Sequence, residues 1–457
     1  NYAFSLRADL CLIPEITDEF SEDLLERFYS LYDSRQMSAS ETLELLRSEL
    51  QKLSGNLPIR RGESLTFVTR RLPYGFAFPE VPSTHLFKYP DLGIAVINGF
   101  AAEQPSTRGV GVSVLVDPET TDAPEIEAAE KLLRAHHVFV RRYQGPTANV
   151  RAVAEMVELF PYDLLIIATH CGDAPGYRWT YEFTDSEGIH RKLVVDIAIG
   201  VERTDEAEML KVTQFLRFIS LDGVDWHDPK KSDKLYVGTA MNDFVTRTRP
   251  GSADELKPVT KETVERVIGS AVLNMHDQNY IALPRPIANS GTPILINNAC
   301  SSWHRLAGTF TFCNARAYVG TLFPIGTTEA HDVVVKLLGE HFWKPLPEAL
   351  WLAQRQVYED DVRRPYVMTG VYPQRLRVVR HNVLHHISTR LSRSLEQCRS
   401  DLHSVDPNDE RRKKAITEVI RYYEREVTAF QQRWLRNSPI GGALSTPERD
   451  SLPKPQV

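Results

Sequence analysis

The 457-residue sequence is 42% hydrophobic and 25% charged, with a net charge of −6. This is the composition of an ordinary globular chain with enough length for two or three domains. The longest apolar runs are too short to span a membrane, and the first residues do not resemble a signal peptide. The five cysteines form no CxxC pair, which argues against a disulfide framework and a structural zinc site: Cys11, Cys171, Cys300, Cys313 and Cys398. We therefore expect a protein of the reducing cytoplasm.

Residues 1–85 are expected to form a mainly helical segment. The clearest helix is Ser40–Leu53, where leucines recur at helical spacing and Ser38 or Ser40 can cap the first turn. Several prolines between residues 58 and 90 then exclude a long element.

From residue 86 onwards the pattern changes to alternating strands and helices. Apolar strands are predicted at Gly111–Val116, Val138–Arg141 and Leu164–Thr169, with helices at Ala123–His136 and Thr147–Leu159 between them. Strands that are apolar along their whole length indicate a parallel sheet with helices on both faces. The sequence thus predicts a doubly wound α/β domain over residues 86–372.

The second half of this domain repeats the alternation. Its predicted strands are Pro293–Asn298, Ala317–Phe323 and Tyr366–Gly370, and its predicted helices are Thr327–Trp343 and Pro347–Asp360. Between the halves lies an insertion, Pro175–Ser290, in which we expect a hairpin of Arg178–Phe183 with Arg191–Ala198 and a strand at Leu235–Gly238.

The C-terminal part is predicted to be helical and basic over residues 373–436, and residues 437–457 are expected to be disordered. Between Arg375 and Arg436 there are fourteen Lys and Arg against eight Asp and Glu, a local charge of +6 in a chain of −6. Such a region is either a solvated helix surface or a contact for an anionic partner, including nucleic acid.

Two of the predicted strands end in reactive side chains. Leu164–Thr169 runs into His170, and the strand of Pro293–Asn298 leads to Cys300. The carboxyl ends of parallel strands meet at one edge of a sheet, where ligands bind. If the two strands are neighbours, the imidazole can take the proton of the thiol and make it a better nucleophile. A free cysteine is otherwise commonly a small buried hydrophobic residue.

The residues around this pair resemble those of the caspase-like clan of cysteine peptidases, which includes caspases, separase and gingipain. Asp163–Gly172 is similar to the histidine strand of that clan, and Ile294–Ser302 to its cysteine strand. Ala315–Gly326, Pro347–Gln356 and Tyr366–Tyr372 resemble, in type and order, the following elements of the CHAT branch, the relatives of separase. The resemblance covers roughly residues 90–372.

The resemblance implies a role for each site residue. Cys300 attacks the scissile carbonyl, and His170 acts as base and later protonates the leaving amine. Backbone N–H groups of Cys300 and of Cys171 or Gly172 hold the oxyanion, and no metal or organic cofactor is required. Glu329 or Asp332 can line a pocket for a basic side chain, although both can simply favour a helix N-terminus. The sequence departs from the common His-Gly pattern because Cys171 precedes Gly172.

We therefore expect an endopeptidase that cuts a protein partner and is controlled by a regulatory protein or ribonucleoprotein. The resemblance loosely implies a larger assembly of the kind found in bacterial antiviral defence. The alternative is a catalytically inactive caspase-like docking module.

Overall fold

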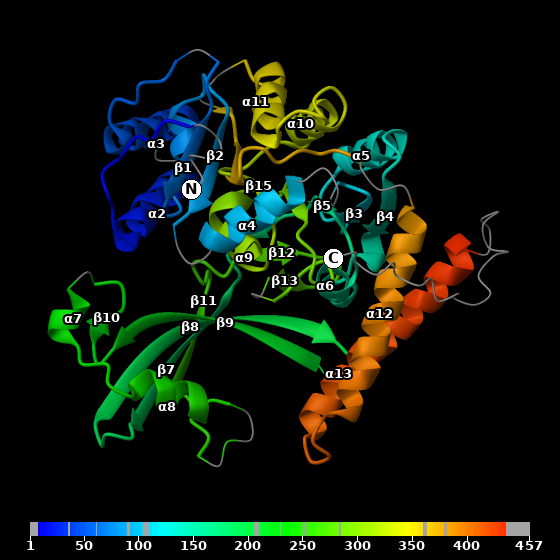
Figure 1. The fold of residues 1–457 in the computed structure, drawn as a ribbon. Coiled ribbons are helices and arrows are strands. Elements are labelled where there is room, and N and C mark those ends of the chain that lie inside the picture. Colours follow the sequence, from blue (N-terminus) through cyan, green and yellow to red (C-terminus); the bar gives the residue numbers. More distant parts are fainter. Residues whose placement is uncertain are drawn as a thin grey trace, which may run out of the picture. The chain divides into compact units, whose positions relative to one another are not determined.

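The computed structural model describes residues 8–34, 37–60, 62–88, 92–103, 109–204, 210–228, 230–249, 252, 254–282, 285–359, 363–378 and 382–435. The chain divides into two compact units, Asn1–Val379 and Arg380–Val457. The first unit contains all the strands and both residues of the expected catalytic pair (Figure 1).

An eight-stranded sheet forms the centre of the first unit. Its strand order is β1-β2-β16-β15-β14-β5-β3-β4. The strands span Leu65–Thr69 (β1), Ser83–Phe87 (β2), Tyr366–Gly370 (β16), Ala317–Thr321 (β15), Ile294–Asn297 (β14), Leu164–Ile167 (β5), Val112–Asp117 (β3) and Phe139–Gln144 (β4). All adjacent pairs are parallel except β15 with β16, so five strands run one way and three the other. The predicted mostly parallel α/β sheet is confirmed.

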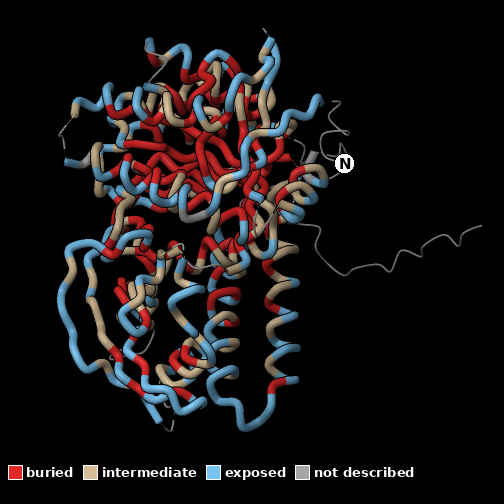
Figure 2. Tube along the Cα trace, turned by 90° about the vertical axis from the view of Figure 1, so that its left-hand side faces the viewer, coloured by how far each residue is buried: buried red, intermediate tan, exposed pale blue. Residues whose placement is uncertain are grey.

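Helices cover both faces of this sheet, as Figure 1 shows. The helices α5 (Pro124–Ala135), α10 (Thr327–Leu338) and α11 (Leu346–Val357) lie on one face; α4 (Leu92–Glu103), α6 (Val150–Leu159) and α9 (Ser302–Phe312) lie on the other. The connections β3–α5–β4 and β4–α6–β5 cross the sheet in opposite directions, so right-handed crossovers place their helices on opposite faces. The strands between the two helix layers are buried on both sides (Figure 2).

The N-terminal residues are built into this unit. Two helices, α2 (Asp18–Ser34) and α3 (Ala39–Ser54), precede a 3-10 turn η1 (Tyr74–Ala77). The predicted cap of α3 is confirmed, since the Ser38 side chain accepts from the Glu41 N–H and Glu41 bonds back to Ser38. The segment also supplies β1 and β2 to the sheet, which the sequence did not indicate.

The insertion leaves the sheet after β5 and forms two small sheets. The larger is antiparallel, in the order β10-β9-β8-β7-β11, and the smaller follows the order β13-β12-β6. The strands are β6 (Cys171–Gly172), β7 (Gly176–Thr184), β8 (His190–Arg203), β9 (Leu210–Leu221), β10 (Val224–Asp225), β11 (Thr260–Val264), β12 (Val272–Asn274) and β13 (Asn279–Ile281). The predicted hairpin is confirmed as β7 and β8.

The predicted strand at Leu235–Gly238 is wrong. This stretch joins two short helices, α7 (Lys231–Lys234) and α8 (Ala240–Arg247), over the apolar face of the larger insertion sheet. The carbonyls of Tyr236 and Val237 accept from the buried guanidinium of Arg191. The backbone is therefore bonded by a side chain instead of a neighbouring strand.

The second unit contains two helices of 21 residues each, α12 (Val383–His403) and α13 (Glu410–Phe430). Arg399 of α12 forms an ion pair with Glu424 of α13 at 2.6 Å. A short π-helical turn, η4 (Gln431–Leu435), follows α13. The expected disorder of residues 437–457 lies outside the described residues. Among the described helices, none has the length and apolarity to cross a membrane.

Candidate active site

The strands that carry His170 and Cys300 are direct neighbours in the sheet, as expected. In the parallel register of β5 and β14, Leu164 lies opposite Ile294 and Ile167 lies opposite Asn297. His170 and Cys300 each follow three residues after that last pair. Adjacent strands lie about 4.8 Å apart, so the chain brings both residues to the same part of the carboxyl edge. His170 is exposed and Cys300 is half-buried.

Cys300 occupies a tight turn between β14 and α9. The next residue, Ser301, has φ 51° and ψ 29°, in the left-handed region that a serine rarely adopts. The Cys300 Sγ lies 4.0 Å from the carbonyl oxygen of Ile325, in the loop that precedes α10. Such strained backbone persists only where the surroundings hold it in place, and it clusters at active sites.

Buried hydrogen bonds from β15 hold this turn. The Tyr318 hydroxyl contacts both the Asn297 amide and the Ser302 carbonyl, at 3.0 and 3.2 Å. The Thr321 hydroxyl donates to the Ala299 carbonyl at 2.7 Å, and its N–H donates to the Ser302 hydroxyl. A buried network with every member bonded is more rigid than isolated contacts, so β15 fixes the backbone on either side of Cys300.

The residues after His170 are paired with the insertion. Cys171 lies opposite Leu273 and Gly172 opposite Val272 in the β6–β12 ladder. The Asn274 N–H donates to the His170 carbonyl at 3.0 Å. Bonded and non-bonded pairs alternate in an antiparallel ladder, so Gly172 and Val272 form the next bonded pair. The N–H of Gly172 therefore turns toward β12, while that of Cys171 turns away from it.

The thiol of Cys171 differs from that of Cys300 in its surroundings. Burial raises the pKa of Cys171 to about 12; Arg305 opposes the rise, and Asp173 and Cys300 add to it. The residue as a whole is half-buried, so the rise reflects the placement of the sulfur itself. At neutral pH this thiol stays protonated and is a poor nucleophile.

The two acids that were expected to bind substrate have structural partners. Glu329 accepts from the Gly326 N–H at 2.9 Å, which caps α10, and pairs with Arg363 at 3.2 Å. Asp332 lies 2.9 Å from the Nδ1 of His331, and half of its side chain is exposed. Of the two, Asp332 is the more accessible to a ligand.

A second acidic group lies at the same edge of the sheet. Glu125, in the first turn of α5, is 4% exposed and accepts from Asn298, two residues before Cys300, at 3.4 Å. Burial raises the pKa of Glu125, and nearby Asp117 adds to the rise. Its Oε2 has no hydrogen-bond partner among the described residues. Asp117 is the last residue of β3. A charged residue at the carboxyl end of an apolar strand is a signal that could have marked Asp117 in the sequence.

Trp303 fills the core below the turn that carries Cys300. Its indole is fully buried, donates to the Thr369 hydroxyl at 2.9 Å and packs against the His85 ring. Trp303 therefore acts in packing.

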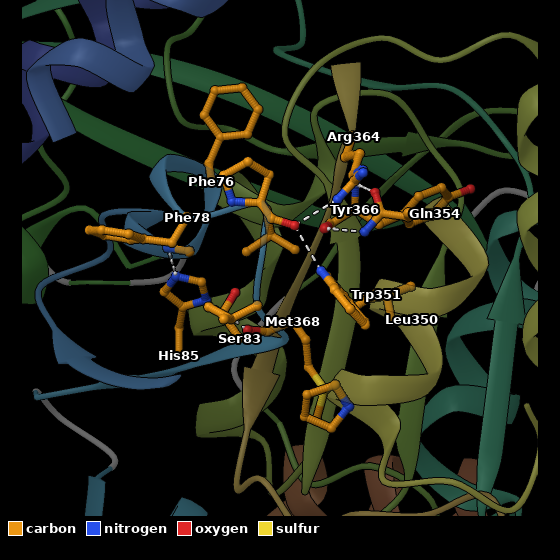
Figure 3. Close-up of a pocket in the computed structure, with 15 residues that line it drawn as sticks. Phe76, Phe78, Ser83, His85, Leu350, Trp351, Gln354, Arg364, Tyr366 and Met368 are labelled. Carbon is orange, nitrogen blue, oxygen red and sulfur yellow. Dashed lines mark hydrogen bonds between the residues drawn. The ribbon is translucent and has the colours of Figure 1, made fainter. Parts of the chain in front are cut away.

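A separate small cleft lies between the η1–β2 segment and α11 (Figure 3). Its polar groups bond to one another: Trp351 and Arg364 both donate to the Pro79 carbonyl, and Gln354 pairs with the backbone of Tyr366. No residue of the predicted site lines it. These contacts join the N-terminal segment to α11 and β16.

No protein-family model matches this chain, and a search among curated proteins found no match. The caspase-like resemblance therefore remains a prediction. Within the residues that the structure describes, no group of three or more His, Cys, Asp or Glu is placed to hold a metal ion. All five cysteines are free.

Proposed function

We propose that this chain is a caspase-like cysteine endopeptidase of the CHAT type with a Cys300–His170 dyad. The observation that carries the proposal is the register of β5 and β14, which gives the thiol and the imidazole equivalent positions beyond neighbouring strands. The strained, braced turn at Cys300 supports it, because a nucleophile needs a fixed position.

The proposed reaction is an acyl transfer. His170 takes the proton of Cys300, and the Sγ attacks the scissile carbonyl to form a tetrahedral oxyanion. The Cys300 and Cys171 N–H groups donate to that oxyanion, since the ladder turns the Gly172 N–H toward β12. Collapse breaks the C–N bond as His170 protonates the amine, and water then hydrolyses the thioester.

The acids at this edge favour a substrate with a basic residue before the cleaved bond. Asp332 is half-exposed, and Glu125 has a buried carboxyl oxygen without a partner among the described residues. A guanidinium or ammonium group would supply the missing donor and offset the cost of burying the carboxyl. The proposed substrate is a protein, and a regulatory protein or ribonucleoprotein would control access in a cytoplasmic assembly.

The test compares the wild-type chain with Cys300→Ala and His170→Gln. The probe is a proteome digested with a Glu-specific protease, whose peptides retain internal Lys and Arg. We expect cleavage after basic residues by the wild type, and a loss of at least about 10³-fold in both variants because each member of such a dyad is essential. Cys313→Ala and His276→Gln are matched controls that should retain activity.

Labelling of the thiols gives an independent measurement. Iodoacetamide at pH 7.5 should modify Cys300 in the folded chain while Cys171 remains unmodified, because its pKa is about 12. Cleavage that survives Cys300→Ala would disprove the peptidase proposal.

The alternative proposal is an inactive docking module. It is favoured by the near-complete burial of Glu125 and Asp117, because a substrate side chain can reach these acids only if neighbouring residues move. Failure of a thiol-reactive peptide probe to label Cys300 under any activating condition would support this alternative. A third proposal is that the basic C-terminal region contacts nucleic acid, and such binding should weaken as the salt concentration rises.

A further inference from the structure

Asp173 lies three residues after His170, and its buried carboxylate gathers three donors. Its side chain is 2% exposed. The carboxylate accepts from Arg305 at 3.1 Å, from Arg266 at 3.3 Å and from the Gly269 N–H at 3.0 Å. Arg305 belongs to α9, whereas Arg266 and Gly269 lie on the returning segment of the insertion. One side chain thus joins three separate parts of the chain next to the histidine.

Arg305 connects Asp173 to the nucleophile. It lies on α9, five residues after Cys300, and its side chain is 10% exposed. A Cβ added at Gly172 would lie 3.9 Å from the Nη1 of Arg305, so the guanidinium runs beside the residues that follow His170. It also lowers the pKa of Cys171 against the effect of burial. The Arg305–Asp173 pair therefore links the cysteine helix to the histidine loop.

Hydrogen bonds on either side of Ala174 extend the contact between the histidine loop and the returning segment of the insertion. The Val267 N–H donates to the Ala174 carbonyl at 2.8 Å, and the Ala174 N–H donates to the Ser270 hydroxyl at 2.7 Å. On one side of these bonds is the β7–β11 pairing, and on the other is the β6–β12 pairing. Asp173 lies between the two pairings, where the backbone leaves one sheet for the other.

We propose that Asp173, acting through Arg305, is a positioning residue that holds the Cys171 N–H where the oxyanion forms. The inference rests on the proposed peptidase function. A buried ion pair such as Arg305–Asp173 adds little to the stability of the fold, because the cost of desolvation offsets much of the attraction between the charges. Well-packed apolar residues would stabilise the fold equally well. What the pair adds is a fixed geometry between the turn of Cys300 and the backbone of Cys171.

Asp173→Asn tests this role, because it retains the size of the side chain and removes the charge. Two rates are measured on the full chain: cleavage of the peptide from the Glu-specific digest that the wild type cleaves fastest, and alkylation of Cys300 by iodoacetamide. Alkylation forms an S–C bond with departure of iodide and involves no oxyanion. We expect kcat to fall on the order of 10²-fold, with KM and the alkylation rate changed less than about threefold.

Asp196→Asn is the matched control. Asp196 has a side chain that is 4% exposed, lies in the same insertion and bonds Arg178 twice, at 2.7 and 2.9 Å. Its loss should leave both rates within about threefold of the wild type. Arg305→Lys provides a second variant, since it keeps the charge but loses the planar donor group. We expect it to lower kcat about tenfold, also with unchanged alkylation.

The outcomes separate the two proposals. Equal losses of cleavage and alkylation, or full kcat in both Asp173→Asn and Arg305→Lys, would overturn the positioning role while the peptidase proposal stands. If Asp173→Asn does not fold, Arg305→Lys alone decides between the same results. If the wild type cleaves no peptide, or only peptides that Cys300→Ala also cleaves, the peptidase proposal fails, and the positioning role fails with it.

Discussion

Gly320 on β15 packs closely against the turn that carries Cys300. A Cβ there would lie 2.8 Å from the Tyr318 ring and 2.9 Å from both the Ser302 Oγ and the Trp303 Cα. At such distances the neighbouring backbone must shift. The same residues brace the turn that carries Cys300, so a change in packing at β15 acts directly on the proposed nucleophile.

We therefore predict that Gly320→Ala lowers the free energy of unfolding by about 1–3 kcal/mol and reduces kcat more than KM. The measurements are urea unfolding and peptide cleavage. Gly308→Ala is the control, because the nearest atoms to its added Cβ are on the Arg71 side chain at 3.6 Å. In the middle of α9, that alanine should stabilise the chain by about 0.5–1 kcal/mol. Full activity in Gly320→Ala would show that the turn tolerates displacement.

At the scale of elements, the edge strand pair β1–β2 depends on a neutral histidine. His85 on β2 is fully buried; its Nε2 accepts from the Gly75 N–H, and its Nδ1 contacts the Met368 carbonyl. Burial lowers the pKa of His85 to about 4, against the hydrogen bond to Met368. Between pH 6.5 and 4 the unfolded chain binds a proton that the folded chain does not. The free energy of unfolding therefore decreases as the pH is lowered from 6.5 to 4.

We predict that His85 accounts for roughly 3 kcal/mol of the loss in unfolding free energy between pH 7 and pH 4. Urea unfolding of the wild type and of His85→Gln over this range measures the difference. His190→Gln is the control, because His190 is exposed. An identical pH dependence in the wild type and His85→Gln would contradict the prediction.

The sequence predicted elements well where periodicity and burial agree. Strand β16 coincides with the predicted Tyr366–Gly370, and the helix predicted at Ser40–Leu53 is α3. The apolar run Leu92–Ile97 lies in helix α4. From the sequence alone, a run of this length does not distinguish a buried helix from a strand. The predicted helix Thr327–Trp343 ends at Leu338, before Gly339. Strands β1 and β12 were missed because they are short and depend on partners distant in the sequence.

The same distinction applies to the candidate site. His170 and Cys300 were found because each follows an apolar strand, and strand ends are local features. Asp173, Arg305 and Glu125 were missed because their roles depend on contacts between segments far apart in the sequence. The sequence left open whether Glu329 binds substrate or favours the N-terminus of a helix. In the structure Glu329 caps the N-terminus of α10.

At the scale of the whole molecule, the described core of the sheet lies entirely within the first unit. One buried cluster joins the strands β3, β4, β5, β14, β15 and β16 with the helices α5, α10 and α11. Residues 374–378, which the sequence assigned to the basic C-terminal region, also belong to this unit: the Gln374 carbonyl accepts from the Leu346 N–H, and the Arg377 carbonyl accepts from the Val110 N–H.

We predict that a chain ending at Val379 folds and retains Cys300 reactivity, because a domain with its own hydrophobic core can fold alone. Circular dichroism, urea unfolding and iodoacetamide labelling of the shortened chain are the measurements. We expect a cooperative transition and a labelling rate within about threefold of the full chain. Loss of the transition would show that Arg380–Val457 is required for folding.

The outer sheet of the insertion begins and ends in two antiparallel neighbours, β7 and β11, with Gly176 opposite Val264. Its two ends are therefore as close as the ends of a hairpin, whatever the size of the loop between them. An exchange of the outer sheet for a larger, smaller or unrelated module would leave the pairing beside His170 intact. The fold thus has a junction at which new recognition surfaces can be acquired during evolution without rebuilding the proposed catalytic centre.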